Sequence, residues 1–402
     1  MNRLLVLVLS IVKFFTRISR RLQGVSGEEA AYDRLVSGKV WEEFCDTLKA
    51  AGASVMGFGS PKDALSQAEG YRYLSRLIRA GLENFLEFAD PGAPVFRRLV
   101  HETVKMGADN PDNYYYNAPV SGAFDYLITG TRGTVHFLGF STQKGSYGRT
   151  GGLPSTGFLD ADGLKIKPGG SFEITVSAAP KSGNWLPMEP ETSMIIVRQT
   201  FLDREKETPA DLHISRIGSD GQTPVPSAPT PESVTEGLLT AAKLVSGASF
   251  LFANWARDFK KHVNSLPQFD PEKSTAAGGD PKIAYYHSYW KLEQDEALVI
   301  ETTPPECEHW NFQLNNHWME SLDYRYFTIH VNKHTAVYGA EGSVKVIVAH
   351  EDPGLPNWIN TTGHGCGTMC WRWIKASEHP EPRTRVVKLA ELRALSRGSV
   401  HG

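Results

Sequence analysis

The chain has 402 residues, of which 41% are hydrophobic and 22% are charged. These are ordinary globular values, and the length predicts two or three domains of about 150 residues each. A net charge of −3, with Lys and Arg dispersed after residue 22, argues against nucleic acid as the main partner. Four cysteines are too few for a disulfide framework in a chain of this length.

The segment 1–24 predicts a basic amphipathic helix. Residues 1–22 contain no acidic residue, and their apolar residues recur at helical spacing opposite Lys13 and Arg17. The apolar run 4–9 is too short to span a bilayer, and no clean cleavage motif follows it. We therefore expect a cytoplasmic or peripheral membrane protein that contacts an anionic membrane surface through residues 1–22. The alternatives are an uncleaved signal anchor and an arm that packs on the protein.

A helical region is expected from residue 30 to residue 106, with separate helices over 40–51, 64–88 and 94–106. The longest of these carries a stripe of apolar residues that we expect to face a core. The sequence 109–113 then marks the end of the helical region, because Asp, Asn and Pro are residues that favour turns.

From residue 113, short apolar runs alternate with Gly-rich breaks, which is typical of antiparallel strands in a β-sandwich or jelly roll. The strands are predicted over 124–128, 134–140, 172–176, 194–201 and 212–217. A Pro- and Ser-rich linker is expected at 218–232. A helix over 233–266, interrupted near Gly247, then opens a second half that ends near residue 390.

The second half repeats the landmarks of the first in the same order and at a nearly constant offset. Tyrosines, His-aromatic and Asn-Trp pairs and strand arginines all correspond: Tyr114 with Tyr285, His136 with His309, Asn184-Trp185 with Asn357-Trp358, and Arg198 with Arg372. The sequence therefore predicts an α+β protein with an internal duplication. Its parts are 30–217, a helical prelude plus a β-sandwich, and 233–390, a helical segment plus a second β-sandwich.

Two repeated features are candidates for ligand contact. Trp185 and Trp358 each follow an Asn at a strand corner, where an indole can stack on a sugar or an apolar ligand. Because both copies have them, a structural plug at the end of the sandwich is the favoured interpretation. Arg198 and Arg372 lie within strands and need a carboxylate or carbonyl partner there. We expect structural tethers, with anion recognition as the alternative.

The sequence after residue 306 holds the candidate acid–base groups. His309, Asn311 and Gln313 would project from one face of a strand at a period of two, which suggests a wet cleft. The alternative is a solvent-facing strand. His317 and Asp323 follow closely, and a histidine with a carboxylate can transfer protons if the fold brings them within hydrogen-bond reach. A two-histidine–carboxylate metal site from His309, His317 and Asp323 is a weaker alternative.

The remaining candidates are weaker. Trp318 and Arg132, which stands in a Gly-containing turn, are candidates for positioning a substrate. Cys366 and Cys370 could bind zinc, but they have no second pair at matching spacing. No nucleophile elbow, phosphate-binding loop, zinc-protease motif or dinucleotide fingerprint occurs in the chain. No metal site is therefore predicted, and the sequence identifies no cofactor.

The order of these motifs resembles a known family. The run 182–200, with Asn184-Trp185 followed by Arg198, is similar to the bacterial domain-of-unknown-function family 1214, and residues 352–373 resemble the same signature. The resemblance covers most of 109–217 and 340–389. It implies a β-rich, jelly-roll-like architecture with helical additions and a loose hydrolase-like label, and it implies no catalytic residue.

Three functions follow from the sequence as hypotheses. The first is an enzyme, hydrolase- or lyase-like, that acts on a small apolar or glycan-like substrate with His309, His317 and Asp323 as its acid–base groups. The second is a non-catalytic module that binds carbohydrate or lipid through Trp185 and Trp358. The third is a membrane-associated scaffold. The expected partner is a small molecule or a glycan, and the oligomeric state is left open.

Overall fold

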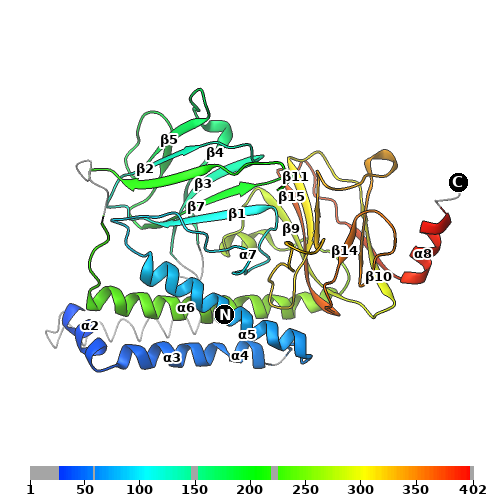
Figure 1. Ribbon diagram of the computed structural model, residues 1–402, viewed down its shortest axis with the longest axis horizontal. Helices are drawn as coiled ribbons and strands as arrows, with labels where there is room; N and C mark the ends of the chain where they lie inside the picture. The colour runs from blue at the N-terminus through cyan, green and yellow to red at the C-terminus, as the bar shows by residue number, and fades with distance from the viewer. Residues whose placement is uncertain (1–26, 58, 146–152, 219–224, 399–402) are drawn as a thin grey trace.

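The computed structural model describes residues 27–57, 59–145, 153–218 and 225–398. The predicted N-terminal helix over 1–24 lies outside these ranges. Two β-sandwiches stand side by side on a shared layer of helices (Figure 1). The predicted α+β class, with two sandwich units preceded by helices, is confirmed.

The helical layer combines segments from both halves of the chain. Its members are α2 (Gly27–Val36), α3 (Lys39–Ala51), α4 (Ala53–Met56), α5 (Ala64–Leu82) with the π-helical turn η1 (Glu83–Glu87), and α6 (Pro231–Phe259) with η3 (Lys260–His262). Asp63 caps α5 by accepting from the backbone N–H of Ser66, and Thr230 and Ser233 form a capping box at the start of α6. Because α6 packs against both α3 and α5, the two halves share one helical core.

The two sandwiches have the same topology. In the first, β1 (Asn113–Pro119), β7 (Thr192–Thr200), β3 (Phe137–Lys144) and β4 (Ser155–Asp160) form one sheet in that order, and β6 (Trp185–Pro187), β5 (Ser171–Ser177), β2 (Tyr126–Thr131) and β8 (Asp211–Arg216) form the other. In the second, the sheets are β9 (Ile283–Lys291), β15 (Cys366–Ile374), β11 (His309–Leu314) and β12 (His330–Asn332), and β14 (Trp358–Asn360), β13 (Val344–Ala349), β10 (Glu296–Thr302) and β16 (Arg383–Lys388). The elements α7 (Pro271–Ala276) and α8 (Leu389–Gly398) flank the second sandwich.

Two helix predictions are wrong. Residues 94–106 form no helix, because the backbone of Arg97 exchanges hydrogen bonds with Asn117 of β1 and the segment lies along the sheet instead. The helix α6 continues without interruption through Gly247. Its packing against α3 and α5 outweighs the cost of one helical glycine, about 1 kcal/mol.

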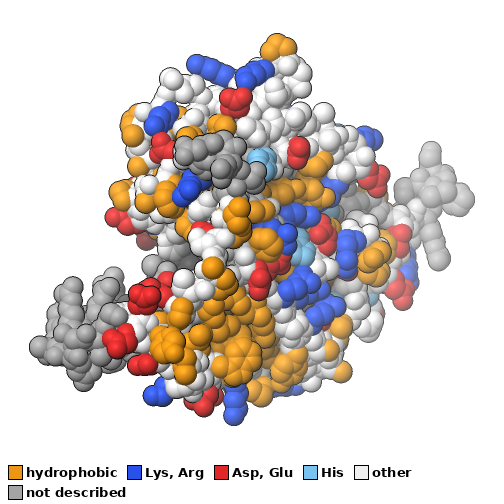
Figure 2. Space-filling view, turned by 60° about the vertical axis from the view of Figure 1, so that its left-hand side comes forward, with side chains coloured by type: hydrophobic (Ala, Val, Ile, Leu, Met, Phe, Trp, Pro, Cys, Tyr) orange, Lys and Arg blue, Asp and Glu red, His pale blue; other side chains and the backbone are white. Residues whose placement is uncertain are grey.

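Apolar character in the helical layer is not confined to its core. Among the described residues, Pro231–His262 is long and apolar enough to cross a membrane, and 56% of its 18-residue apolar window is buried inside the protein; a buried core helix meets the same criteria of length and composition. Apolar side chains also gather on the outside of the lower part of the molecule, where the helices lie (Figure 2). The exposed apolar side chains of the helices include Tyr32, Val36, Trp41, Met56 and Tyr71.

Candidate functional site

The polar face of β11 is buried at the junction between the two halves. His309 is 1% exposed, and Asn311 and Gln313 are 0% exposed. Asn311 Nδ2 donates to Asp112 Oδ2 at 2.8 Å, and Gln313 Nε2 donates to the carbonyl of Asp109 at 2.9 Å. The predicted wet cleft and the solvent-facing alternative are therefore both wrong, because the turn before β1 covers this face.

Asp112 is the anchor of this junction. Its carboxylate accepts from His309 Nε2 at 3.2 Å, from His330 Nε2 at 3.1 Å and from Asn332 Nδ2 at 3.0 Å. Burial alone would raise the pKa of Asp112, but the hydrogen bonds from the two histidines outweigh burial and hold that pKa well below the ordinary value. The adjoining small cavity, about 40 Å³, has room for a few waters only. Asp112 therefore acts as an ionised link between the halves.

The three predicted acid–base residues are not assembled into one site. His317 Nδ1 lies 3.1 Å from Tyr289 Oη, and burial lowers the pKa of His317 to about 3. Asp323 forms a surface ion pair with Arg325, with Oδ2 and Nη2 2.7 Å apart. Within the described ranges, no hydrogen bond or ion pair joins any two of His309, His317 and Asp323.

Two residues predicted to position a substrate have other contacts. Trp318 is 1% exposed, and its indole N–H donates to the carbonyl of Ser66 on α5 at 2.8 Å. Arg132 lies in the turn between β2 and β3, where Nη2 donates to the carbonyl of His136 at 3.2 Å. Trp318 therefore joins the second sandwich to the helical layer, and Arg132 lines neither the small cavity nor the large one described below.

The Asn-Trp corners are built alike in both halves. Asn184 Nδ2 donates to the carbonyls of Lys165 and Glu173, and Asn357 Nδ2 donates to those of Val337 and Lys345. The indole N–H of Trp185 donates to Ser177, and that of Trp358 donates to the carbonyl of Ala349. These bonds tie each corner to the neighbouring strand and support the structural interpretation of both indoles.

Cysteine and histidine side chains near β15 do not form a metal site. Cys370 is fully buried, with Sγ 4.0 Å from His287 Nε2, and Cys366 Sγ lies 3.3 Å from Tyr289 Oη. Among the described residues, no group of three or more His, Cys, Asp or Glu side chains could hold a metal ion.

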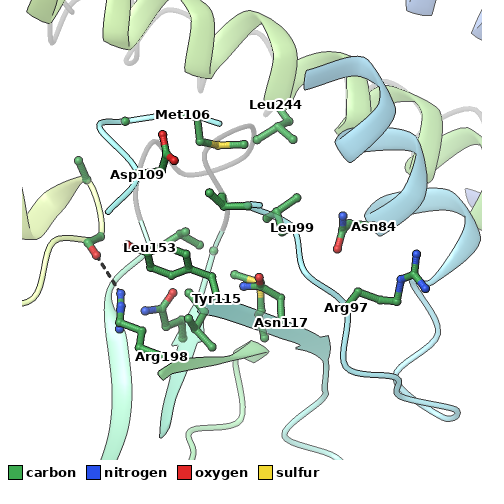
Figure 3. Close-up of a pocket in the computed structure, with 18 of the residues that line it drawn as sticks. Asn84, Arg97, Leu99, Met106, Asp109, Tyr115, Asn117, Leu153, Arg198 and Leu244 are labelled. Carbon is green, nitrogen blue, oxygen red and sulfur yellow. Dashed lines mark hydrogen bonds between the residues drawn. The ribbon is translucent and has the colours of Figure 1, made fainter. Parts of the chain in front are cut away.

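A large cavity lies between the first sandwich and the helical layer. It has a volume of about 600 Å³, within the range of small-molecule sites. Figure 3 shows the sheet below it and α6 and the end of α5 above it, with Leu99, Met106 and Leu244 along its upper side. Most of its lining is apolar, including Phe85, Leu99, Met106, Ile196, Leu244 and Phe252. A ligand there would bury chiefly hydrocarbon surface.

The floor of the cavity is the outer face of the sheet β1-β7-β3. Residues alternate between the two faces of a strand, so Met194, Ile196 and Arg198 of β7 face the cavity, while Ile195 and Val197 pack in the sandwich core. Tyr115 of β1 pairs with Arg198 in the register. The second half of the chain closes one end, with the segment 277–280 and the side chains of Tyr285 and Arg372.

The two strand arginines have different surroundings. Arg372 is 3% exposed, and its guanidinium donates to Asn311 Oδ1 at 3.2 Å, to Gln313 Oε1 at 2.6 Å and to the carbonyl of Ala108 at 2.5 Å. The tether prediction is confirmed for Arg372. Arg198 makes a single described hydrogen bond, to the carbonyl of Gly278 at 3.3 Å (Figure 3). None of the described carboxylates lies within ion-pair distance of Arg198, which leaves most of its donors free.

The register explains this difference. Arg372 lies opposite Asn311 on β11, and the pair two residues along is Cys370 with Gln313. Arg198 lies opposite Gly139 on β3, and the pair two residues along is Ile196 with Ser141. Glycine offers no side-chain acceptor, and the Ser141 hydroxyl donates to the carbonyl of Ile196. A comparison of the two copies could have identified Arg198 as the arginine without side-chain acceptors, but only once the strand register was known.

Comparisons with known proteins include a strong likeness to a protein of known structure. No family model matches the chain, and no curated protein matches it, so the resemblance to family 1214 stays a prediction. The chain is similar to an uncharacterised protein from Burkholderia cenocepacia whose crystal structure is known, with 53% identity over 89% of this chain and 99% of that one, and a TM-score of 0.86. A Vibrio parahaemolyticus protein of known structure is 12% identical over 80% of this chain and 98% of that one, with a TM-score of 0.47.

Proposed function

This chain belongs to the same family as the Burkholderia cenocepacia protein. From the geometry of the cavity above β1-β7-β3, we propose that it binds there a small, mainly apolar molecule with an anionic group. The proposal deepens the lipid-binding hypothesis from the sequence. The observation that carries it is Arg198, a half-buried guanidinium with one described hydrogen bond at the edge of a 600 Å³ apolar cavity.

The positive charge of Arg198 supports an anionic group at its end of the cavity. A desolvated guanidinium gains most from a carboxylate or phosphate, which accepts two of its N–H groups at once. Asp280 also lines the cavity, but its Oδ1 accepts from the backbone N–H of Lys282 at 2.9 Å, and no ion pair joins Asp280 to Arg198. Arg372, whose guanidinium makes three hydrogen bonds within the protein, adds a second positive charge to the lining.

The lining supports hydrocarbon rather than sugar. A glycan site needs polar groups for many hydroxyls, whereas the walls here are formed mainly by aliphatic and aromatic side chains. The Trp185 and Trp358 corners, which were the candidates for sugar stacking, do not line this cavity. The enzyme hypothesis has no comparable support, because His309, His317 and Asp323 lie apart.

The test is calorimetric titration of the full chain with decanoate and with decan-1-ol, which differ in charge. We expect decanoate to bind more tightly, and Arg198→Met to weaken it about tenfold or more, since a hydrogen-bonded charge pair contributes about 1.5–3 kcal/mol. The alcohol should bind both proteins equally. Arg325→Met is the matched control, because it removes a positive charge that faces Asp323 and not the cavity. Equal decanoate affinity in the wild type and Arg198→Met would refute the proposal.

A further inference from the structure

A second polar group lines the cavity without a partner. Gln143 of β3 is 3% exposed and belongs to the cavity lining. Its Oε1 is buried and has no hydrogen-bond partner. A buried amide oxygen without a hydrogen bond is costly. It is therefore a group that a ligand could satisfy.

Gln143 and Arg198 lie at different ends of the same floor. In the register Gln143 pairs with Met194 of β7, whereas Arg198 pairs with Gly139. Met194 and Arg198 are four residues apart on one strand, which separates them by about 13 Å. Between them lies Ile196, beside Asn117 of β1, whose Nδ2 already contacts Met194 Sδ at 3.5 Å. The floor thus has a cationic end, an apolar middle and a neutral polar end.

From this arrangement we propose that the ligand is bifunctional: an elongated apolar molecule with an anionic group against Arg198 and a neutral hydroxyl against Gln143. The inference rests on the proposed function and adds the chemistry of the ligand's far end. A hydroxyl suits this position because it both donates and accepts, so it satisfies the amide in either orientation. A chain with a methyl end would leave that amide unpaired.

The distance between Gln143 and Arg198 makes the preference for an ω-hydroxyl depend on the length of the ligand chain. A chain whose hydroxyl lies about 13 Å from its carboxylate reaches both groups, whereas a shorter or longer chain reaches only one of them without bending. The probes are octanoate, decanoate and dodecanoate, each with its ω-hydroxy counterpart, titrated into the full chain by calorimetry. We expect the ω-hydroxyl to tighten binding about five- to tenfold at one chain length, and to weaken it at the others, where the hydroxyl meets apolar walls.

Two variants locate the effect. Gln143→Met keeps the length of the side chain and removes its amide, so the gain from the ω-hydroxyl should disappear while the methyl-ended carboxylate binds at least as well as before. Asn84→Leu is the matched control, because this cavity-lining amide already donates to the carbonyl of Ala80 at 2.8 Å. The gain should persist in Asn84→Leu. Melting curves of both variants check that they are folded. If one is not, the comparison of each carboxylate with its ω-hydroxy counterpart on the wild-type protein still tests the proposal.

The outcomes separate this inference from the proposed function. If carboxylates bind through Arg198 but no chain length gains from the hydroxyl, the bifunctional ligand is refuted and the proposed function stands. A gain that persists in folded Gln143→Met refutes the assignment to Gln143. If none of the carboxylates binds in an Arg198-dependent way, both proposals fall together.

Discussion

The replacement Arg372→Met tests whether the two repeated arginines have diverged as the register indicates. The Arg372 guanidinium joins Asn311 and Gln313 of the second half to the carbonyl of Ala108 in the first. Methionine fills similar space but donates no hydrogen bond, so all three acceptors lose their partner in a site that is 3% exposed. The nearby negative charge of Asp112 also loses an attractive neighbour.

The magnitude follows from burial. Each buried acceptor left unpaired costs about 1–3 kcal/mol, and Arg372→Met leaves three of them. We therefore expect a loss of at least about 3 kcal/mol in the free energy of unfolding. The equivalent change Arg198→Met removes one 3.3 Å hydrogen bond from a half-buried side chain, and we expect it to cost about 1 kcal/mol or less. The same substitution at equivalent strand positions should therefore differ in its effect by at least about 2 kcal/mol.

The assay is urea denaturation of the wild type and both variants, followed by circular dichroism and by tryptophan fluorescence so that intermediates are detected. Arg372→Met should lower the midpoint strongly and Arg198→Met only slightly. Equal shifts, or a larger shift for Arg198→Met, would refute the conclusion that the junction between the halves depends on Arg372.

Three further predictions follow, two on the helical layer and one on the segment 1–22. A Cβ at Gly70 would lie 2.6 Å from Trp318 Cζ2, so Gly70→Ala should cost about 1–3 kcal/mol in urea denaturation; wild-type stability would show that α5 can shift. Burial acts to lower the pKa of His364, but the hydrogen bond and charge of Glu69, 2.8 Å away, raise it above 6.5. That stabilisation is full below about pH 6.5 and is lost as the pH rises through the raised pKa, so His364→Gln should flatten the fall in melting temperature above pH 6.5; an unchanged slope contradicts this. Deletion of residues 1–22 should abolish flotation with anionic liposomes, and unchanged flotation would exclude them as the main membrane contact.

The candidate site shows what a strand pattern can and cannot predict. The period-two rule correctly placed His309, Asn311 and Gln313 on one face of β11. It did not reveal that this face is buried, because the turn that covers it belongs to the other half of the chain, about 200 residues earlier. The same polar sequence suits a wet cleft or a buried junction. Only the partner surface distinguishes them.

The sequence by itself determined the repeated architecture. Alternating apolar runs, turn residues and the repeated Asn-Trp and Arg landmarks are local features, and both sandwiches have the strand order that equivalent sequences should give. The extent of the helices depended less on local sequence. Contacts of the segment 94–106 with β1, and of α6 with the neighbouring helices, decided it.

Only the tertiary structure decided where a ligand could bind. The cavity needs the helical layer above β1-β7-β3, and its two polar ends, Arg198 and Gln143, owe their free donors and acceptors to neighbours on other strands. Arg198 and Arg372 are alike in sequence, and their difference lies in what faces them: Gly139 in one copy and Asn311 in the other. Hydrogen bonding between side chains depends on positions in space, and a single sequence specifies those positions only through the folded chain.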